Sequence, residues 1–260
     1  KEFLDYTKSK GNDLYSVAKP GDKWCLCEYR WHQAFKDGMA PKVYLEGTNN
    51  RTKRNITKRK DGKKLSVIME AKKFDFNYWD GPREYGYGGY NYDGRWIAVA
   101  KDIISHFNLK NNSKILDIGS GKGFLLHDLR LQNASFETYG LDISKYAIEK
   151  SISDMKERTI LHNAKDPLPY EDNFFDLVLS INTLHNLKKE EIISCLDEIN
   201  RILKNQENCY IVVDSYSNEM QKEIFESWVL TAEFYGYPNE WFEVFEKGDY
   251  KGFYSWTIIK

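Results

Sequence analysis

The pattern of apolar and polar positions becomes regular at about residue 97. From there, short apolar runs alternate with stretches in which apolar residues recur at helical spacing. We expect strands at 114–118, 139–143, 159–162, 174–181, 210–213, 241–245 and 253–259. We expect helices at 97–107, 124–131, 145–156, 189–203 and 218–230. Strict alternation of the two predicts an α/β fold, a mostly parallel sheet with helices on both faces.

The last two predicted strands have no helix between them. Residues 241–245 and 253–259 are both rich in aromatic residues, and they flank the short sequence Lys247-Gly248-Asp249. A short connection can join antiparallel strands, whereas parallel strands need a long crossover. We therefore expect a seven-stranded sheet with one antiparallel strand at its end.

Composition and charge narrow the class of protein. The chain has 260 residues, of which 41% are hydrophobic and 30% charged, as is usual for a globular protein. Lys and Arg number 38 against 39 Asp and Glu, so the net charge of -1 argues against a general nucleic-acid binder. There is no apolar run of eighteen residues, and the four cysteines form no metal-binding pattern. We expect a cytoplasmic protein with reduced thiols, no metal and no membrane partner.

The residues before 97 form two segments. Residues 1–64 are interpreted as an N-terminal appendage that ends in a basic linker, because 51–64 contains eight Lys or Arg and one acidic residue. An exposed linker is the preferred interpretation of this run, and contact with RNA, DNA or an acidic partner is the alternative. Residues 65–96 are rich in Tyr and Gly.

One glycine-rich motif carries the chemistry. Asp117, Gly119, Gly121 and Gly123 follow the apolar run 114–118 and precede a predicted helix. Glycines allow the backbone to pass close to a ligand, and a helix N-terminus attracts anionic groups. Asp142 ends the next strand, where a carboxylate can accept both hydroxyls of a ribose. The spacing fits neither the dinucleotide fingerprint nor the P-loop.

The D-x-G-x-G-x-G form resembles motif I of class I S-adenosylmethionine-dependent methyltransferases. Asn163-Ala164 and the sequence from Pro167 to Ser180 resemble the adenine-side loop and fourth strand of that family. The resemblance covers about 95–260. It implies a Rossmann-like methyltransferase domain at 97–260, with S-adenosyl-L-methionine as cofactor and S-adenosyl-L-homocysteine as product.

The resemblance also implies which residues bind the cofactor. Gly119 and Gly121 would lie under its methionine part, Asp142 would bind the ribose, and Ile143 would flank the adenine. Arg95 is added because a guanidinium can pair with the cofactor carboxylate. The full expected set is Tyr92, Arg95, Asp117, Gly119, Ser120, Gly121, Asp142, Ile143, Asn163, Ala164 and Ser180.

Acceptor residues are expected at the carboxyl ends of strands four and five, where ligands of open parallel sheets bind. A hydroxyl acceptor must lose a proton, and an imidazole that titrates near neutral pH can take it. His185 is the candidate base, with packing in the following helix as the alternative. The candidate catalytic residues are His185 and Asp214, and the candidate substrate-binding residues are Tyr87, Tyr90, Asn182 and Tyr216.

The Tyr-Gly-rich segment at 65–96 stands where such enzymes usually have a lid over cofactor and acceptor. Glycines permit closure, and tyrosines supply flat faces and hydroxyl groups. A structural aromatic loop is the alternative. The stretch from Tyr78 onward also resembles a bacterial branch of this superfamily that we associate with small-molecule or carbohydrate-pathway genes.

The N-terminal part resembles a different family. Residues 3–50 are similar to a small bacterial domain of unknown function. Cys25 and Cys27 with His32 could ligate a metal, but the further ligands of a complete site are not evident, and we favour a structural role.

Together these patterns predict a methyltransferase acting on an O or N atom of a small polar metabolite. One alternative is RNA or protein methylation, with the basic run at 51–64 as a docking arm. The other is a cofactor-binding regulatory module without catalysis. The expected partner is a small-molecule substrate rather than nucleic acid, and the sequence predicts no oligomeric state.

Overall fold

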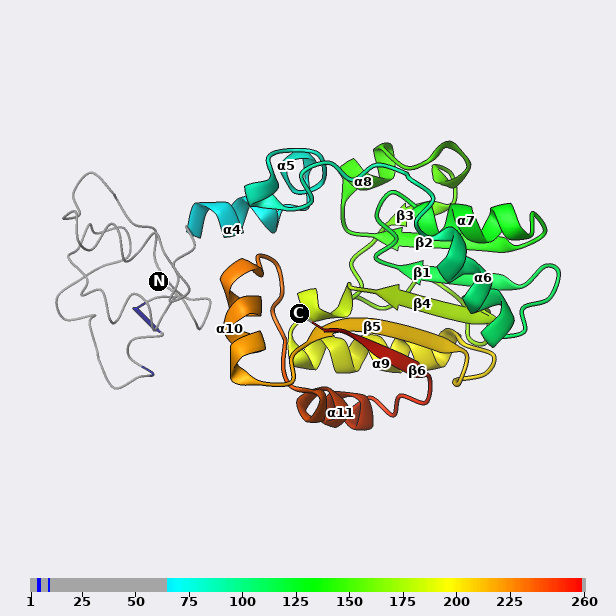
Figure 1. Cartoon of the computed structure of the whole chain (residues 1–260). Helices are drawn as coiled ribbons and strands as arrows, with labels where there is room; N and C mark the ends of the chain where they lie inside the picture. The colour runs from blue at the N-terminus through cyan, green and yellow to red at the C-terminus, as the bar shows by residue number, and fades with distance from the viewer. Residues whose placement is uncertain (1–3, 6–8, 10–64, 259–260) are drawn as a thin grey trace. The chain divides into compact units, whose positions relative to one another are not determined.

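The structure is a computed structural model, and it describes residues 4–5, 9 and 65–258 (Figure 1). The residues from 67 to 258 belong to one compact unit. Its strands are β1 Lys114–Ile118, β2 Glu137–Asp142, β3 Thr159–Leu161, β4 Leu177–Ile181, β5 Cys209–Ser215 and β6 Phe253–Ile258. Its longer helices are α6 Ile97–His106, α7 Phe124–Gln132, α9 Lys189–Ile202, α10 Glu219–Trp228 and α11 Pro238–Lys247. Shorter elements are α4 Leu65–Ala71, α5 Phe76–Trp79, η2 Arg83–Tyr85, α8 Lys145–Glu149, η3 Ser153–Met155 and η4 Leu184–Asn186.

The six strands form one sheet in the order β3-β2-β1-β4-β5-β6. All five neighbouring pairs are parallel. The chain builds the sheet outward from β1 to β3, and then returns to the other side of β1 for β4. In open parallel sheets this reversal of strand order opens a crevice at the carboxyl ends of the strands. The glycine-rich motif leaves β1 at this reversal.

The prediction of a seven-stranded sheet with one antiparallel strand is wrong. Residues 241–245, predicted as a strand, lie inside the helix α11. Its buried side chains Trp241, Val244 and Phe245 recur at helical spacing, and Pro238 stands in the first turn, where its fixed φ favours a helix. With a helix between them, β5 and β6 are connected by a crossover and pair in parallel.

The sheet has an apolar core on each face, as the alternation along β1 shows. Ile115 packs with buried residues of α6 and α7 on one face. Leu116 and Ile118 point to the other face and pack with residues of α9 and α11. Because helices cover both faces of the sheet, polar groups gather at the sheet edges and at the carboxyl ends of its strands.

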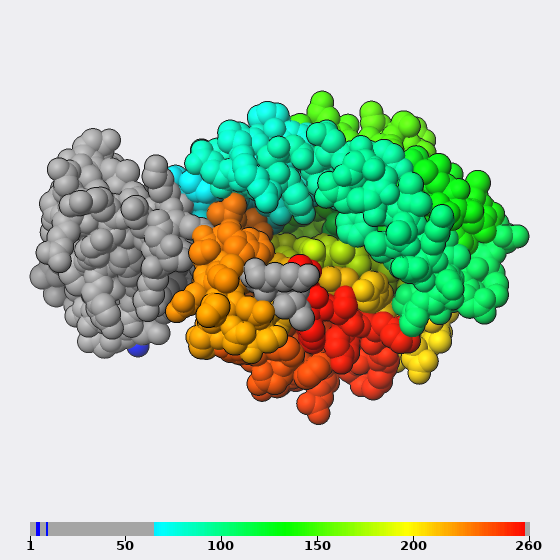
Figure 2. Space-filling view, viewed as in Figure 1, coloured from blue at the N-terminus to red at the C-terminus, as the bar shows by residue number. Residues whose placement is uncertain are grey.

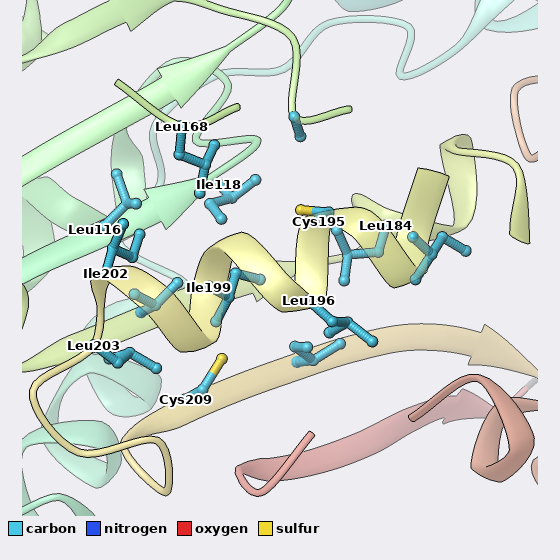
Figure 3. Packing of buried hydrophobic residues seen from close by; sticks show 14 of the residues in the cluster. Leu116, Ile118, Leu168, Leu184, Cys195, Leu196, Ile199, Ile202, Leu203 and Cys209 are labelled. Carbon is cyan, nitrogen blue, oxygen red and sulfur yellow. The ribbon is translucent and has the colours of Figure 1, made fainter. Parts of the chain in front are cut away.

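Helix α9 supplies much of the second core (Figure 3). Its buried side chains are Ile192, Cys195, Leu196, Ile199 and Ile202. Cys195 lies in this core with Cys209 of β5, and both thiols are free. Burial raises the pKa of each thiol to about 12. Both groups are therefore protonated at neutral pH and behave as small apolar side chains.

Some predictions concern residues outside the described part of the chain. These are the appendage at 3–50, with Cys25, Cys27 and His32, and the basic run at 51–64. Within the described part, none of the helices has the length and apolar character that crossing a bilayer requires.

Candidate functional site

The loop between β1 and α7 is built around three glycines in the left-handed region. Gly119, Gly121 and Gly123 have φ angles of 81°, 55° and 78°, which other residues adopt only with strain. There is also little space for a side chain at these glycines. A Cβ on Gly119 would lie 2.0 Å from Oγ1 of Thr183, and one on Gly121 would lie 2.8 Å from the indole of Trp79. The loop is therefore packed closely against protein side chains from two other parts of the chain.

Asp142 fixes this loop from the end of β2. Its Oδ2 accepts a hydrogen bond from the backbone N–H of Gly121 at 2.7 Å, and its Oδ1 accepts one from that of Ser144 at 2.7 Å. Burial raises the pKa of the Asp142 carboxyl, and these backbone hydrogen bonds oppose the rise. A carboxylate has about four acceptor positions, so further acceptor positions remain for a ligand.

Asp117, at the end of β1, is a buried carboxyl beside Asp142. Within the described residues, its Oδ1 has no hydrogen-bond partner. Burial, and then the charge of Asp142, raise the pKa of Asp117 to about 7. A buried acid of this kind near the carboxyl end of a central strand is typical of a functional site. It favours a ligand that brings a positive charge.

A second pair of titratable groups lies at the ends of β4 and β5. Nδ1 of His185 is 3.5 Å from Oδ2 of Asp214, and it accepts the backbone N–H of Asp214 at 3.4 Å. Burial lowers the pKa of His185, and the charge of Asp214 only partly opposes this effect. Burial also raises the pKa of Asp214. The imidazole is therefore neutral near pH 7, and with Nδ1 accepting, its proton is on Nε2.

Asn182 connects the ends of three strands at this position. It follows β4 with a left-handed backbone, φ 53°, and its N–H donates to the carbonyl of Val212 in β5 at 2.8 Å. Its side-chain Oδ1 accepts the hydroxyl of Thr257 in β6 at 3.0 Å. The amide that we expected to face the acceptor is thus held by the neighbouring strands, close to the end of β5 that carries Asp214.

Residues 74–92 form what we call the aromatic cover, which lies on the glycine loop. The rings of Trp79 and Tyr87 are stacked at 5.3 Å and 11°, and Tyr90 stacks on Phe124 of α7 at 5.0 Å. The indole N–H of Trp79 donates to the hydroxyl of Ser144 at 2.9 Å. Tyr87 and Tyr90, both expected to bind substrate, are therefore brought to the loop that carries the motif.

Tyr78 of the aromatic cover is a site residue that the sequence analysis missed. Its hydroxyl is in hydrogen-bonding contact with Thr231 and Tyr87, and the carboxyls of Asp142 and Asp214 both act on it. Burial raises the pKa of Tyr78 to about 12. The phenol therefore stays protonated and can donate a hydrogen bond between the ends of β2 and β5. Among so many tyrosines, no spacing rule indicates which one points inward.

The structure places three expected site residues elsewhere. The hydroxyl of Tyr92 donates to Oδ1 of Asp128 on α7 at 2.6 Å. Arg95 is exposed and forms an ion pair with Asp93 at 2.7 Å. Tyr216 is buried in a separate cluster with residues of α10 and of the segment that follows it. Tyr92 also packs on Phe124, the first residue after the glycine loop, with ring centroids 5.6 Å apart, and Tyr216, which we expected to face the acceptor, directly follows β5.

The remaining expected residues differ in exposure. Ser120 and Ser180 are buried, and the hydroxyl of Ser180 donates to the carbonyl of Ile118 at 3.4 Å. Ala164 belongs to the core on the α9 face. Asn163 accepts the N–H of Lys165 in a turn at 3.2 Å. Ile143, half exposed, directly follows Asp142, as a residue flanking a ligand would.

Figure 2 shows a hollow between the aromatic cover and the C-terminal strand, with the end of β4 at its floor. A concave surface at the carboxyl ends of parallel strands is where ligands of such sheets bind. The indole of Trp79 covers the glycine loop in this structure, so a nucleoside-like ligand there requires this ring to move, and a second molecule would lie beside His185 and Asp214.

Comparison with known families agrees with this geometry. Residues 116–211 match a family described as a methyltransferase domain. This part of the chain is therefore similar to methyltransferase domains. Residues 1–63 match a family described as an uncharacterized protein conserved in bacteria, DUF2237. This match confirms the resemblance of residues 3–50 to a small bacterial domain family of unknown function.

Two curated relatives align with parts of the chain. An uncharacterized protein of Methanocaldococcus jannaschii is 35% identical over 123 residues, 47% of this chain and 50% of that protein. A demethylmenaquinone methyltransferase of Staphylococcus saprophyticus is 31% identical over 108 residues, 40% of this chain and 46% of that enzyme. The chain spans about half the length of these relatives.

Solved structures also resemble the chain. One is a complex that contains the Trm112 methyltransferase activator of Haloferax volcanii, at 20% identity and a TM-score of 0.47, covering 61% of this chain and 77% of that one. Another is the YcgJ protein of Bacillus subtilis, at 19% identity and a TM-score of 0.46, covering 60% of this chain and 68% of that one.

Proposed function

We propose that this protein transfers a methyl group from S-adenosylmethionine to an oxygen or nitrogen atom of a small polar acceptor. The observation that carries the proposal is the pair of buried carboxyls, Asp117 and Asp142, at the left-handed glycine loop. The family match at 116–211 supports the same cofactor.

The residues of the loop fit this cofactor. Asp117 Oδ1 lacks a partner among the described residues, and it would pair with the positive charge of the bound molecule. Asp142 keeps acceptor positions for the two ribose hydroxyls, since its backbone contacts use only some of them. When bound, the cofactor supplies an electrophilic methyl group on a positively charged sulfur.

His185 and Asp214 would prepare the acceptor. The ring proton on Nε2 makes neutral His185 a donor that can orient an acceptor oxygen. Asp214, whose pKa burial raises, can take the proton that a hydroxyl loses. We assign proton transfer to the pair, with Asp214 as its carboxylate base and His185 as the residue that orients the acceptor.

A small acceptor is supported by the aromatic cover. The charge of the Asp214 carboxyl at the end of β5 acts on both Tyr78 and Tyr87, and Tyr87 stacks on Trp79, which covers the loop. The hydroxyl of Tyr78 and the amide of Asn182 add polar groups that suit a hydroxylated or amine-bearing metabolite. Closing such a site also excludes water from the reacting groups.

The test uses the full chain with a labelled methyl donor and separated metabolite, RNA and protein fractions. We expect label in the metabolite fraction and binding of S-adenosylhomocysteine by calorimetry. Label in RNA or protein would replace the small acceptor with a macromolecule. Binding without transfer to any fraction would make the chain a cofactor-binding module, and absence of binding would refute the proposal.

A further inference from the structure

Lys122 occupies an unusual place in the glycine loop. It stands between Gly121 and Gly123, and its side chain is only 5% exposed. Lysine is rarely buried unless its charge is paired. Its Nζ donates to both carboxylate oxygens of Asp80, at 2.7 and 2.8 Å, and to the carbonyl of Tyr90 at 2.8 Å. The three hydrogens of the ammonium are thereby accounted for.

Both of these acceptors belong to the aromatic cover. Asp80 follows Trp79, and Tyr90 packs on the first residue of α7. One lysine of the loop therefore holds the cover at two points ten residues apart. The cover also closes on itself, because the backbone N–H of Tyr90 donates to Oδ1 of Asp80 at 3.1 Å.

Asp80 has a further donor on α8. The hydroxyl of Tyr146 donates to its Oδ2 at 2.8 Å. Burial by itself would raise the pKa of Asp80, but the hydrogen bonds from Lys122, Tyr146 and Tyr90 outweigh it, and the net pKa is lowered. The carboxyl is thus charged at neutral pH, and it joins the cover, the loop and α8 at one point.

This point lies beside the ring that covers the motif. The indole of Trp79 stands over Gly121, so near that a single added carbon would touch it at 2.8 Å. A ligand that binds along the loop must displace this ring and must leave by the same way. Because Asp80 is the next residue, a backbone movement that lifts the ring from the loop would also act on the bonds between Asp80 and Lys122.

We propose that Asp80 and Lys122 form a latch that controls exchange of the nucleoside cofactor, with Asp80 as a positioning residue for the aromatic cover. This inference rests on the proposed function for its ligand. Each reaction cycle requires release of the spent cofactor, and opening of a cover is often the slow step of such cycles. The latch keeps the cover closed while the acceptor reacts.

The first experiment measures release of S-adenosylhomocysteine by a stopped-flow chase with the full chain. Loss of a charge-assisted pair weakens closure enough that we expect release about tenfold faster in Asp80→Asn and in Lys122→Met. The double variant should accelerate release by less than the product of the two single effects, since both changes remove the same contact between Asp80 and Lys122. Glu84→Gln changes an exposed carboxylate of the same segment, and its release rate should match that of the wild type.

The second experiment needs no ligand. Hydrogen exchange of the ligand-free protein is followed in peptides that span 75–92. Asp80→Asn should exchange faster there and should leave the strands β4 and β5 unchanged, whereas Glu84→Gln should leave all peptides unchanged. If Asp80→Asn fails to fold, Tyr146→Phe removes a single hydrogen bond of the latch, and it should show a smaller increase in both measurements.

The outcomes separate the two proposals. If the wild type binds no S-adenosylhomocysteine, the proposed function fails, and hydrogen exchange alone decides whether the latch exists. If the wild type binds it and the Asp80→Asn release rate equals that of the wild type, the latch does not control exchange. Unchanged protection at 75–92 in that variant would remove the latch altogether.

Discussion

Replacing Asp117 by Asn removes a charge that the folded protein holds at a cost. Burial and the neighbouring Asp142 raise the pKa of Asp117 from 3.8 to about 7. The folded state therefore binds this proton more tightly than the unfolded chain does. Stability from this group is complete below about pH 3.8, and it falls as the pH rises through about 7.

The size of the effect follows from the pKa shift. A difference of about 3 pKa units corresponds to about 4 kcal/mol at most, from about 1.4 kcal/mol per unit. Above pH 7 the ligand-free wild type carries this penalty, and Asp117→Asn does not. We therefore expect the variant to be more stable than the wild type at pH 8, by up to about 4 kcal/mol, and the difference should shrink to about 1.5 kcal/mol at pH 5.

Urea denaturation of both proteins without ligand, from pH 5 to pH 8, measures this difference. Asp102→Asn, which changes an exposed carboxylate on α6, serves as the control and should follow the wild type. In the same variant, binding of S-adenosylhomocysteine should be weaker at pH 8, because its positive group loses its partner. A stability difference between variant and wild type that does not change with pH would refute the reasoning.

Three further outcomes are expected. Asp142→Ala leaves the N–H of Gly121 without its acceptor, so the free energy of unfolding should fall by about 2 kcal/mol in chemical denaturation, and calorimetry should detect no binding of S-adenosylhomocysteine. Gly119→Ala places a carbon 2.0 Å from Thr183 and should lower the melting temperature, with partial recovery in the double variant that also carries Thr183→Ala. His185→Gln keeps a donor, so turnover of the labelled acceptor should fall by less than in Asp214→Asn, and equal turnover in wild type and Asp214→Asn would exclude proton transfer by that carboxylate.

The part of the site that is local in sequence could be predicted. The motif can be recognised from the sequence alone, because a buried strand, a left-handed turn and a helix start follow one another within a few residues. This pattern identifies Asp117, the three glycines and Asp142. The apolar runs of β1, β4 and β5 are likewise visible without tertiary information. The positions of these strands along the chain follow from local sequence patterns.

The other features depend on contacts between distant segments. Residues 241–245 have the aromatic content of a strand. The structure shows that they form a helix, because Trp241, Val244 and Phe245 are the buried residues and they recur at helical spacing. The contact of Tyr78 with Thr231 joins residues far apart in the chain. The pairing of Lys122 with Asp80 likewise exists only once the aromatic cover has folded onto the loop.

The order of the strands has a consequence for how the protein acquires its site. The two central strands, β1 and β4, pair residues about 60 positions apart, such as Ile115 with Leu177. Closing so long a loop costs chain entropy before the strand pairing contributes stabilising free energy. Non-local contacts of this kind therefore slow folding. The glycine turn follows β1 and is hydrogen-bonded to Asp142 of β2. It can therefore take its shape only after the strands have assembled. We therefore expect a nascent or partly refolded chain to form its local helices before the glycine turn takes its shape.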